Sequence, residues 1–199
     1  TLSEVDFAEI FRGFGEATIR VRETGCTAAE GFDNQFVTCE RCWHLDRKED
    51  QADLAWLLTQ CLKPKVIHLG TPCTQMCTIG PRFIDKATEQ QKLFTIAVLQ
   101  HQVATGRHAS VEQPTASLLY TRGPWIRAFG ELTKPMYPWS YAEGDGCQLG
   151  HVFLGDDKRG MPLKKFQTWM SSFDLSMMEL RCRRPRVLAG CTHEHAIIR

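Results

Sequence analysis

The chain has 199 residues, of which 43% are hydrophobic and 24% charged, and its formal net charge at pH 7 is +1. This composition is typical of a globular protein with a sizeable core, and the length predicts a single domain over residues 1–199. The sequence contains no apolar run of 18 residues, which excludes a transmembrane helix, and it does not open with the basic and then apolar pattern of a signal peptide. So small a net charge gives no global attraction to nucleic acid.

The nine cysteines are odd in number and are spread along the chain rather than set in a compact framework. In the absence of a signal peptide, this usage is typical of reduced thiols, and we expect an intracellular protein of the cytoplasm or nucleus. The positive charge is uneven, because four arginines lie within residues 181–186. Such a cluster can bind phosphates, although a solvated surface edge explains it equally well.

Strand and helix candidates alternate along the first 114 residues. They are a strand over 5–11, a helix over 16–23, a strand over 27–33, a helix over 49–62, a buried strand over 65–70, a long helix over 85–106 and a strand over 108–114. This alternation predicts a doubly wound, Rossmann-like α/β fold, with a mostly parallel sheet and helices on both faces. Beyond residue 130 the pattern is looser, and residues 139–150 and 163–173 are candidates for an antiparallel edge hairpin.

In doubly wound sheets, ligands bind beyond the carboxyl ends of the strands, beside the point where the strand order reverses. The predicted strand ends that hold candidate residues are 12–16, Asp33, 71–77 and 112–114. Polar and reactive side chains therefore gather where this architecture places its ligands.

The first strand end contains Gly13 and Gly15, which allow the backbone to approach a ligand closely before a helix begins. Thr18 occupies the position of the third glycine in the dinucleotide fingerprint, which argues against a nicotinamide cofactor. Asp33 follows Gly13 by 20 residues and is placed to accept hydrogen bonds from ribose hydroxyls, although a turn-forming Asp-Asn pair is an equal alternative. Glu30 competes with Asp33 for this role.

Asp46 is a candidate for the adenine side of the same crevice, or simply a residue at a helix start. Cys73 follows Pro72 directly after the buried strand, and a thiolate there is a potential nucleophile, whereas most cysteines are inert core residues. Glu112 ends the next strand, where it could bind a heterocycle edge, relay a proton or form an ion pair at the rim of the sheet.

The order and spacing of these residues resemble the cytosine-5 methyltransferase family. The matching segments are "FRGFG" at 11–15, the acid Asp33, "TPC" at 71–73 and "VEQP" at 111–114. The intervals of 60 residues from Gly13 to Cys73 and 39 from Cys73 to Glu112 are close to those of the family. Asp46 is a weaker match to the acid of a further family motif, and the resemblance covers roughly residues 6–170.

The resemblance implies S-adenosylmethionine as cofactor, bound by Phe11, Gly13, Gly15, Asp33, Asp46 and Pro72. It further implies that Cys73 adds to carbon 6 of a cytosine in DNA or RNA, that Glu112 holds the base, and that a base in a duplex is flipped out of the stack. Lys165 in "PLKKFQ" (162–167) takes the place of one arginine of the family motif Q-x-R-x-R, and Gln113 takes that of the asparagine in E-N-V.

Leu163 and Gln167 replace the glutamine and last arginine of that motif, and the chain ends about thirty residues later without an obvious target-recognition segment. A partner protein or domain could supply target recognition. The alternative is a catalytically inactive binding or assembly module that keeps the methyltransferase fold.

Cysteines and histidines at metal-ligand spacing form two further clusters, one over 39–44 and one over 182–195. They provide Cys39, Cys42, Cys191, His193 and His195 as ligands of a possible zinc site, while unlinked reduced residues are the simpler interpretation.

Overall fold

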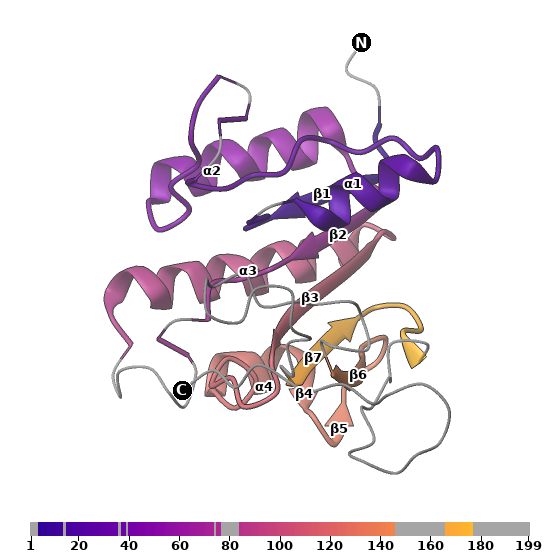
Figure 1. Ribbon diagram of the computed structural model, residues 1–199. Helices are drawn as coiled ribbons and strands as arrows, with labels where there is room; N and C mark the ends of the chain where they lie inside the picture. Colours follow the sequence, from indigo (N-terminus) through magenta and orange to yellow (C-terminus); the bar gives the residue numbers. More distant parts are fainter. Residues whose placement is uncertain are drawn as a thin grey trace, which may run out of the picture.

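A computed structural model of the chain describes residues 4–13, 15–35, 37–38, 40–73, 75–76, 84–145 and 166–176. Its elements in chain order are β1 (Phe7–Ile10), α1 (Glu16–Glu23), α2 (Lys48–Trp56), the π-helix η1 (Leu57–Leu62), β2 (Val66–Leu69), α3 (Lys86–Ala104), β3 (His108–Pro114), α4 (Gly123–Phe129), β4 (Gly130–Glu131), β5 (Lys134–Pro135), β6 (Ser140–Asp145) and β7 (Phe166–Ser171). Figure 1 shows their arrangement.

Five strands form the central sheet in the order β1-β2-β3-β7-β6. The pairs β1–β2 and β2–β3 are parallel, whereas β7 runs antiparallel to both β3 and β6. The predicted α/β class, with a parallel sheet and an antiparallel hairpin at its side, is confirmed. Within the hairpin, β7 lies between two strands and β6 forms the edge of the described sheet.

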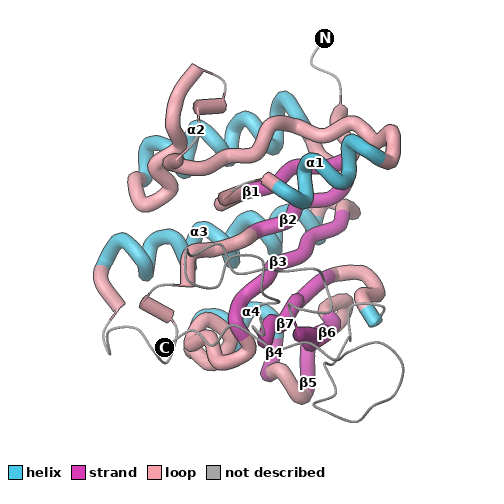
Figure 2. Tube along the Cα trace, viewed as in Figure 1, coloured by secondary structure: helices cyan, strands magenta, loops and turns pink. Residues whose placement is uncertain are grey.

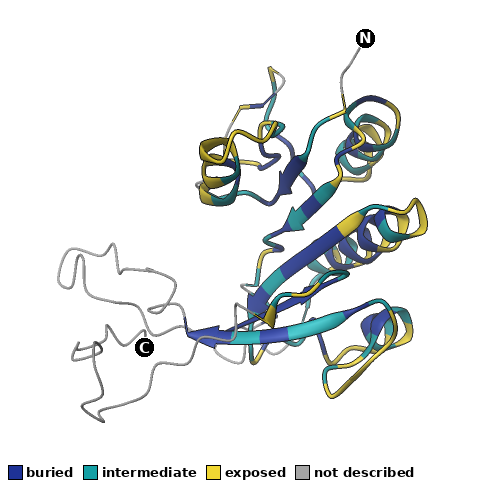
Figure 3. Cartoon of the chain, turned by 90° about the vertical axis from the view of Figure 1, so that its right-hand side faces the viewer, coloured by how far each residue is buried: buried dark blue, intermediate teal, exposed yellow. Residues whose placement is uncertain are grey.

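Helices cover both faces of this sheet, as the doubly wound prediction requires (Figures 1 and 3). On one face, α1 packs against β1. On the other, α3 packs against β2 and β3, with α2 and α4 beside it. Because side chains alternate across a strand, this second face collects fully buried apolar residues, among them Ile67, Leu69 and Val111.

The helix boundaries follow local sequence signals. Gly15 adopts φ 73° immediately before α1, a conformation that glycine tolerates best. The side chain of Asp85 accepts a hydrogen bond from the backbone N–H of Thr88 and so caps the start of α3. The predicted helix over 49–62 is present as α2 and η1, and it ends before Pro64.

The strand predicted over 27–33 is only partly formed. Its backbone makes two isolated parallel bridges with β1, from Ala28 to Phe7 and from Phe32 to Ile10, and Figure 2 shows it as a loop. The segment still lies on the side of β1 opposite β2. From β1 the chain first adds this segment on one side and then returns to add β2 on the other side. The topological switch point, where the strand order reverses, therefore lies between β1 and β2.

Among the described helices, none is long and apolar enough to cross a membrane.

Candidate functional site

The carboxyl ends of β1, β2 and β3 lie at one edge of the sheet because the three strands are parallel. The turn after β1 contains Phe11 and Gly13, the turn after β2 contains Pro72 and Cys73, and β3 carries Glu112 near its end. The start of β7 joins the same edge, because Gln167 pairs with Pro114. The structure thus brings together the segments that the sequence analysis selected.

The turn after β1 has an unusual backbone. Phe11, which is buried, adopts φ 57°, a value rare for a side-chain-bearing residue, and Gly13 follows with φ 50°. The Phe11 N–H donates to the Phe32 carbonyl at 2.8 Å. A Cβ placed on Gly13 would meet no atom of the described residues within 4 Å, so on this side its backbone faces open space. Conformational outliers of this kind cluster at ligand sites.

Asp33 faces this turn directly. Its Oδ2 accepts a hydrogen bond from the Gly13 N–H at 3.2 Å, and its Oδ1 accepts one from the Gln35 N–H at 2.8 Å. The Gln35 bond is that of an Asx-turn, as the turn-forming alternative expects, and ribose binding by Asp33 stays a prediction. A carboxylate offers about four acceptor positions, so these two bonds leave capacity for two hydroxyl donors.

Beneath the turn, Glu9 on β1 joins the strand to α1. Its Oε2 accepts hydrogen bonds from the Thr18 N–H at 3.0 Å and from the Thr18 hydroxyl at 2.6 Å. Burial raises the pKa of the Glu9 carboxyl, against the lowering effect of these bonds. Thr18, which breaks the dinucleotide fingerprint, thus has a structural role that sequence spacing alone did not reveal.

Asp46 lies half-buried in the turn that precedes α2, which begins at Lys48. Asp50, rather than Asp46, holds this region, because it accepts a hydrogen bond from the His44 N–H at 2.7 Å and forms an ion pair with Arg41. Trp43 packs edge-on against Phe32 at 5.3 Å between ring centroids, and its backbone N–H donates to the Asp33 carbonyl at 3.0 Å. An aromatic side chain is therefore fixed next to Asp33.

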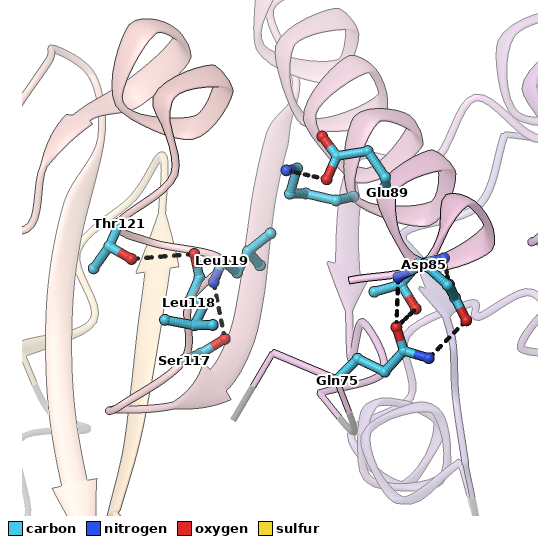
Figure 4. A network of polar contacts seen from close by, with 9 residues as sticks. Gln75, Asp85, Glu89, Ser117, Leu118, Leu119 and Thr121 are labelled. Atoms are coloured by element: carbon cyan, nitrogen blue, oxygen red, sulfur yellow. Dashed lines mark hydrogen bonds and ion pairs between the residues drawn. The ribbon is translucent and has the colours of Figure 1, made fainter. Parts of the chain in front are cut away.

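Cys73 is a free, half-buried cysteine in a turn that is anchored at several points. The Met76 N–H donates to the Cys73 carbonyl at 2.8 Å, and Met76 itself is fully buried. Gln75 bonds to the Asp85 carboxylate at 2.6 Å and accepts from the Asp85 N–H at 2.8 Å, which ties the turn to the start of α3 (Figure 4). The backbone around the thiol is thus held in place.

Gln113 connects the strand ends that carry Cys73 and Glu112. Its amide N–H donates to the carbonyl of Thr71, two residues before the cysteine. Its carbonyl accepts from the Ser117 hydroxyl at 2.9 Å, and the side chain is 1% exposed. Gln113 therefore links the ends of β2 and β3 at the site.

Glu112 is half-buried, and its Oε1 accepts a hydrogen bond from the Gln167 amide at 2.6 Å. Burial and, to a lesser degree, the Glu112 charge raise the pKa of nearby Tyr120 well above its usual value. Gln167 itself is 4% exposed. From the sequence, Gln167 is only a departure from a motif, because its contact with Glu112 joins two residues that are 55 positions apart.

The residues present fit S-adenosylmethionine in two respects. The backbone at Gly13 is open to a ligand, and Asp33 beside it retains acceptor capacity for ribose hydroxyls. Lys165 lies outside the described residues, as do Cys39, Cys191, His193 and His195. Cys42 is half-buried, and within the described ranges no group of three or more potential ligands could hold a metal ion.

No protein-family model matches this chain, and no curated protein matches its sequence. Among solved structures, the S. pombe Dnmt2 methyltransferase is similar to it, with a TM-score of 0.41 and 12% sequence identity. The match covers 86% of this chain and 51% of that one, so the chain spans about half the length of the solved structure.

Proposed function

We propose that this chain is an S-adenosylmethionine-dependent methyltransferase that modifies carbon 5 of cytosine in DNA or RNA, with Cys73 as nucleophile. One observation carries the proposal: a glycine turn hydrogen-bonded to Asp33, a Pro-Cys turn and Glu112 meet at one sheet edge, beside the switch point. These are the positions at which a doubly wound sheet binds a nucleotide-like ligand and presents reactive groups to it.

Each residue has a defined task in this reaction. The Cys73 thiolate forms a bond to carbon 6 of the ring, which shifts electron density onto carbon 5. Glu112 hydrogen-bonds the amine and ring-nitrogen edge and shares the charge that develops there. S-adenosylmethionine supplies the electrophilic methyl group when it is bound. Water then takes the carbon 5 proton, the bond between carbon 6 and the Cys73 sulfur breaks to release the thiolate, and the aromatic ring is restored.

The cofactor half of the proposal is tested by calorimetric titration of S-adenosylmethionine into the native chain. We expect micromolar binding, weakened at least ~10-fold in Asp33→Ala, since a hydrogen bond to a charged group contributes roughly 1.5–3 kcal/mol. Asp174→Ala is the matched control, because this exposed carboxylate accepts local hydrogen bonds from Ser176. A folded native chain that binds no S-adenosylmethionine would contradict the proposal.

The nucleophile is tested separately, with labelled S-adenosylmethionine and bulk DNA or RNA as acceptor. Cys73→Ala should abolish methyl transfer and leave cofactor affinity nearly unchanged. A Cys73→Ala variant that still methylates would refute the covalent mechanism. A partner that provides target recognition would appear as activity only when cell extract is added.

The second candidate is an inactive binding or assembly module on the same fold. It is favoured by the neutral Gln167 at Glu112, where the resembled family has an arginine. Cofactor binding without transfer to any nucleic acid, both in the native chain and in Cys73→Ala, would support this second function.

A further inference from the structure

One surface of the molecule combines positive charge with large apolar side chains that stay in water. It is formed by α4 and by the hairpin of β4 and β5, and we call it the α4 surface. Its members are Arg122, Arg127, Lys134, Met136 and Tyr137, all of them exposed. Tyr137 is 96% exposed and Met136 51%. Neighbouring apolar side chains left in water and surrounded by polar residues are typical of an interaction site.

The hairpin is fixed to the end of α4, so that these residues belong to one continuous surface (Figure 1). The Met136 N–H donates to the Phe129 carbonyl at 2.8 Å. A Cβ placed on Gly130 would lie 3.2 Å from the Met136 Cγ, which shows that the Met136 side chain lies over the junction of helix and hairpin. Tyr137 follows directly in the chain.

The positive charges of this surface lack acidic partners. The Arg127 side chain turns back toward the start of α4, since its Nη1 would lie 3.1 Å from a Cβ placed on Gly123, the residue next to Arg122. Within the described residues, the side chains of Arg122, Arg127 and Lys134 form no ion pair. The sequence from 122 to 138 holds these three cations against one acid, Glu131. Such an excess attracts an anionic partner.

The exposed ring of Tyr137 narrows the class of that partner. A single strand of nucleic acid carries phosphates for the cations and unstacked bases whose faces can stack on an aromatic side chain. An acidic protein segment would satisfy the cations but would offer no planar group to Tyr137. The length also fits, because α4 spans about 10 Å, or roughly three nucleotide steps of 3.4 Å.

The α4 surface begins close to the candidate site. Leu118 precedes Arg122 by four residues, and its backbone N–H donates to the Met76 carbonyl at 2.6 Å. Met76 in turn donates to the Cys73 carbonyl, so it belongs to the Cys73 turn. A strand that lies along α4 can therefore reach this turn at one end.

We propose that the α4 surface binds a single strand of nucleic acid, with Arg122, Arg127 and Lys134 on its phosphates and Tyr137 stacked on one of its bases. These contacts involve neither the sugar nor the base edges, so single-stranded RNA and DNA of one sequence bind alike. The inference goes beyond the proposed function, because binding here requires neither S-adenosylmethionine nor the Cys73 thiol.

The charge contacts are tested by fluorescence anisotropy, with a labelled single strand of about 12 nucleotides, as RNA and as DNA, titrated with the chain at several salt concentrations. In the double variant Arg122→Gln/Arg127→Gln, the slope of log affinity against log salt should become shallower by about 1.4. Each phosphate contact on a single strand contributes about 0.7. Arg47→Gln/Lys48→Gln removes two exposed charges at the start of α2 and should keep the native slope.

The stacking contact is tested at Tyr137. Tyr137→Ala should weaken binding of the single strand at least ~5-fold and leave binding of a duplex of the same sequence unchanged, since a duplex hides the faces of its bases. Tyr137→Phe keeps the ring and should bind like the native chain. Trp56→Ala, which removes another exposed aromatic ring on α2, should have no effect.

Three results would overturn the inference: no binding of the single strand, an unchanged salt slope in the double arginine variant, or native affinity in Tyr137→Ala. Full competition by polyglutamate would also overturn it and would identify an acidic protein as the partner. Strand binding by a chain that transfers no methyl group would remove the proposed function alone. Methyl transfer by a native chain whose strand affinity these variants do not change would remove this inference alone.

Discussion

Single buried side chains, more than surface charges, hold the strand ends of this site together. Gln113 is the clearest case, because its amide joins the Thr71 carbonyl to the Ser117 hydroxyl at 1% exposure. Gln113→Met keeps the length of the side chain but leaves two buried partners unpaired. We expect the free energy of unfolding to fall by about 2–4 kcal/mol, measured by urea denaturation.

Gln100→Met serves as the control for this change, since the exposed Gln100 lies on α3 away from the sheet edge. It should alter the free energy of unfolding by less than about 0.5 kcal/mol. Comparable losses in the two variants would show that the Gln113 bridge contributes nothing specific.

His68 gives a pH-dependent prediction. It lies on β2 with its ring nitrogen Nδ1 2.9 Å from the Ser110 hydroxyl, and burial lowers its pKa to about 4. Between pH 6.5 and 4, His68 binds a proton in the unfolded chain but stays neutral in the folded chain. The free energy of unfolding therefore falls as the pH drops through this window, by up to roughly 3 kcal/mol from this residue.

In His68→Asn, the free energy of unfolding should depend less steeply on pH when urea denaturation is repeated at several pH values from 7 to 4. His101→Asn, on the exposed side of α3, is the matched control and should keep the native slope. If His68→Asn and the native chain lose stability in parallel, the half-buried histidine on β2 is not the cause.

At the level of residues, the sequence located candidates where a side chain follows a strand directly, and their functional roles stay predictions. Asp33, Cys73 and Glu112 were identifiable because turns and strand ends have local signals, and the structure brings them to one edge. Gln167 and Thr18 were missed as partners, because their contacts depend on which strand or helix packs beside them. Sequence spacing does not encode such pairings for single polar residues.

At the scale of elements, helices with clear stop signals were predicted well. The segment 16–23 was expected as a helix, and α1 spans Glu16–Glu23. The strand over 27–33 was wrong in extent, since only Ala28 and Phe32 form bridges with β1. Between these two bridges the backbone has other hydrogen-bond partners. The Gly31 carbonyl, for example, accepts a hydrogen bond from the Thr38 hydroxyl.

The attachment of α1 to β1 can be tested at Thr18, which is 3% exposed. Thr18→Val keeps the shape of the side chain but removes the hydroxyl that donates to Glu9. A buried carboxylate then keeps only the Thr18 N–H of these two donors. We expect the free energy of unfolding to fall by about 1–3 kcal/mol in urea denaturation, the range for leaving a buried polar group without its hydrogen-bond partner.

Thr24→Val, at the exposed end of the same helix, removes only a local bond to the Val21 carbonyl. Its effect should be below about 1 kcal/mol, because water replaces the lost partner. The role assigned to Glu9 and Thr18 would be untenable if the two variants were equally stable.

At the scale of the molecule, the α/β class followed from the alternation of segments, but the order of the strands did not. Successive strands joined by a helix commonly become parallel neighbours, and β1, β2 and β3 are arranged in this way. Strand β7, the last described strand, instead inserts between β3 and β6, which is possible because antiparallel pairing needs no crossover helix. Nothing in residues 163–173 alone distinguishes an interior strand from an edge strand.

This insertion has a consequence for backbone protection that hydrogen exchange can measure. Strand β7 has a partner on each side, so its amides bond alternately to β3 and β6, whereas the outer amides of β6 have no partner strand within the described sheet. Exchange is slow where backbone bonds are buried and paired on both sides. Peptides covering Phe166–Ser171 should therefore exchange as slowly as those covering β2, and peptides covering Ser140–Asp145 should exchange faster. Rapid exchange throughout β7 would place it at an edge and separate Gln167 from Glu112.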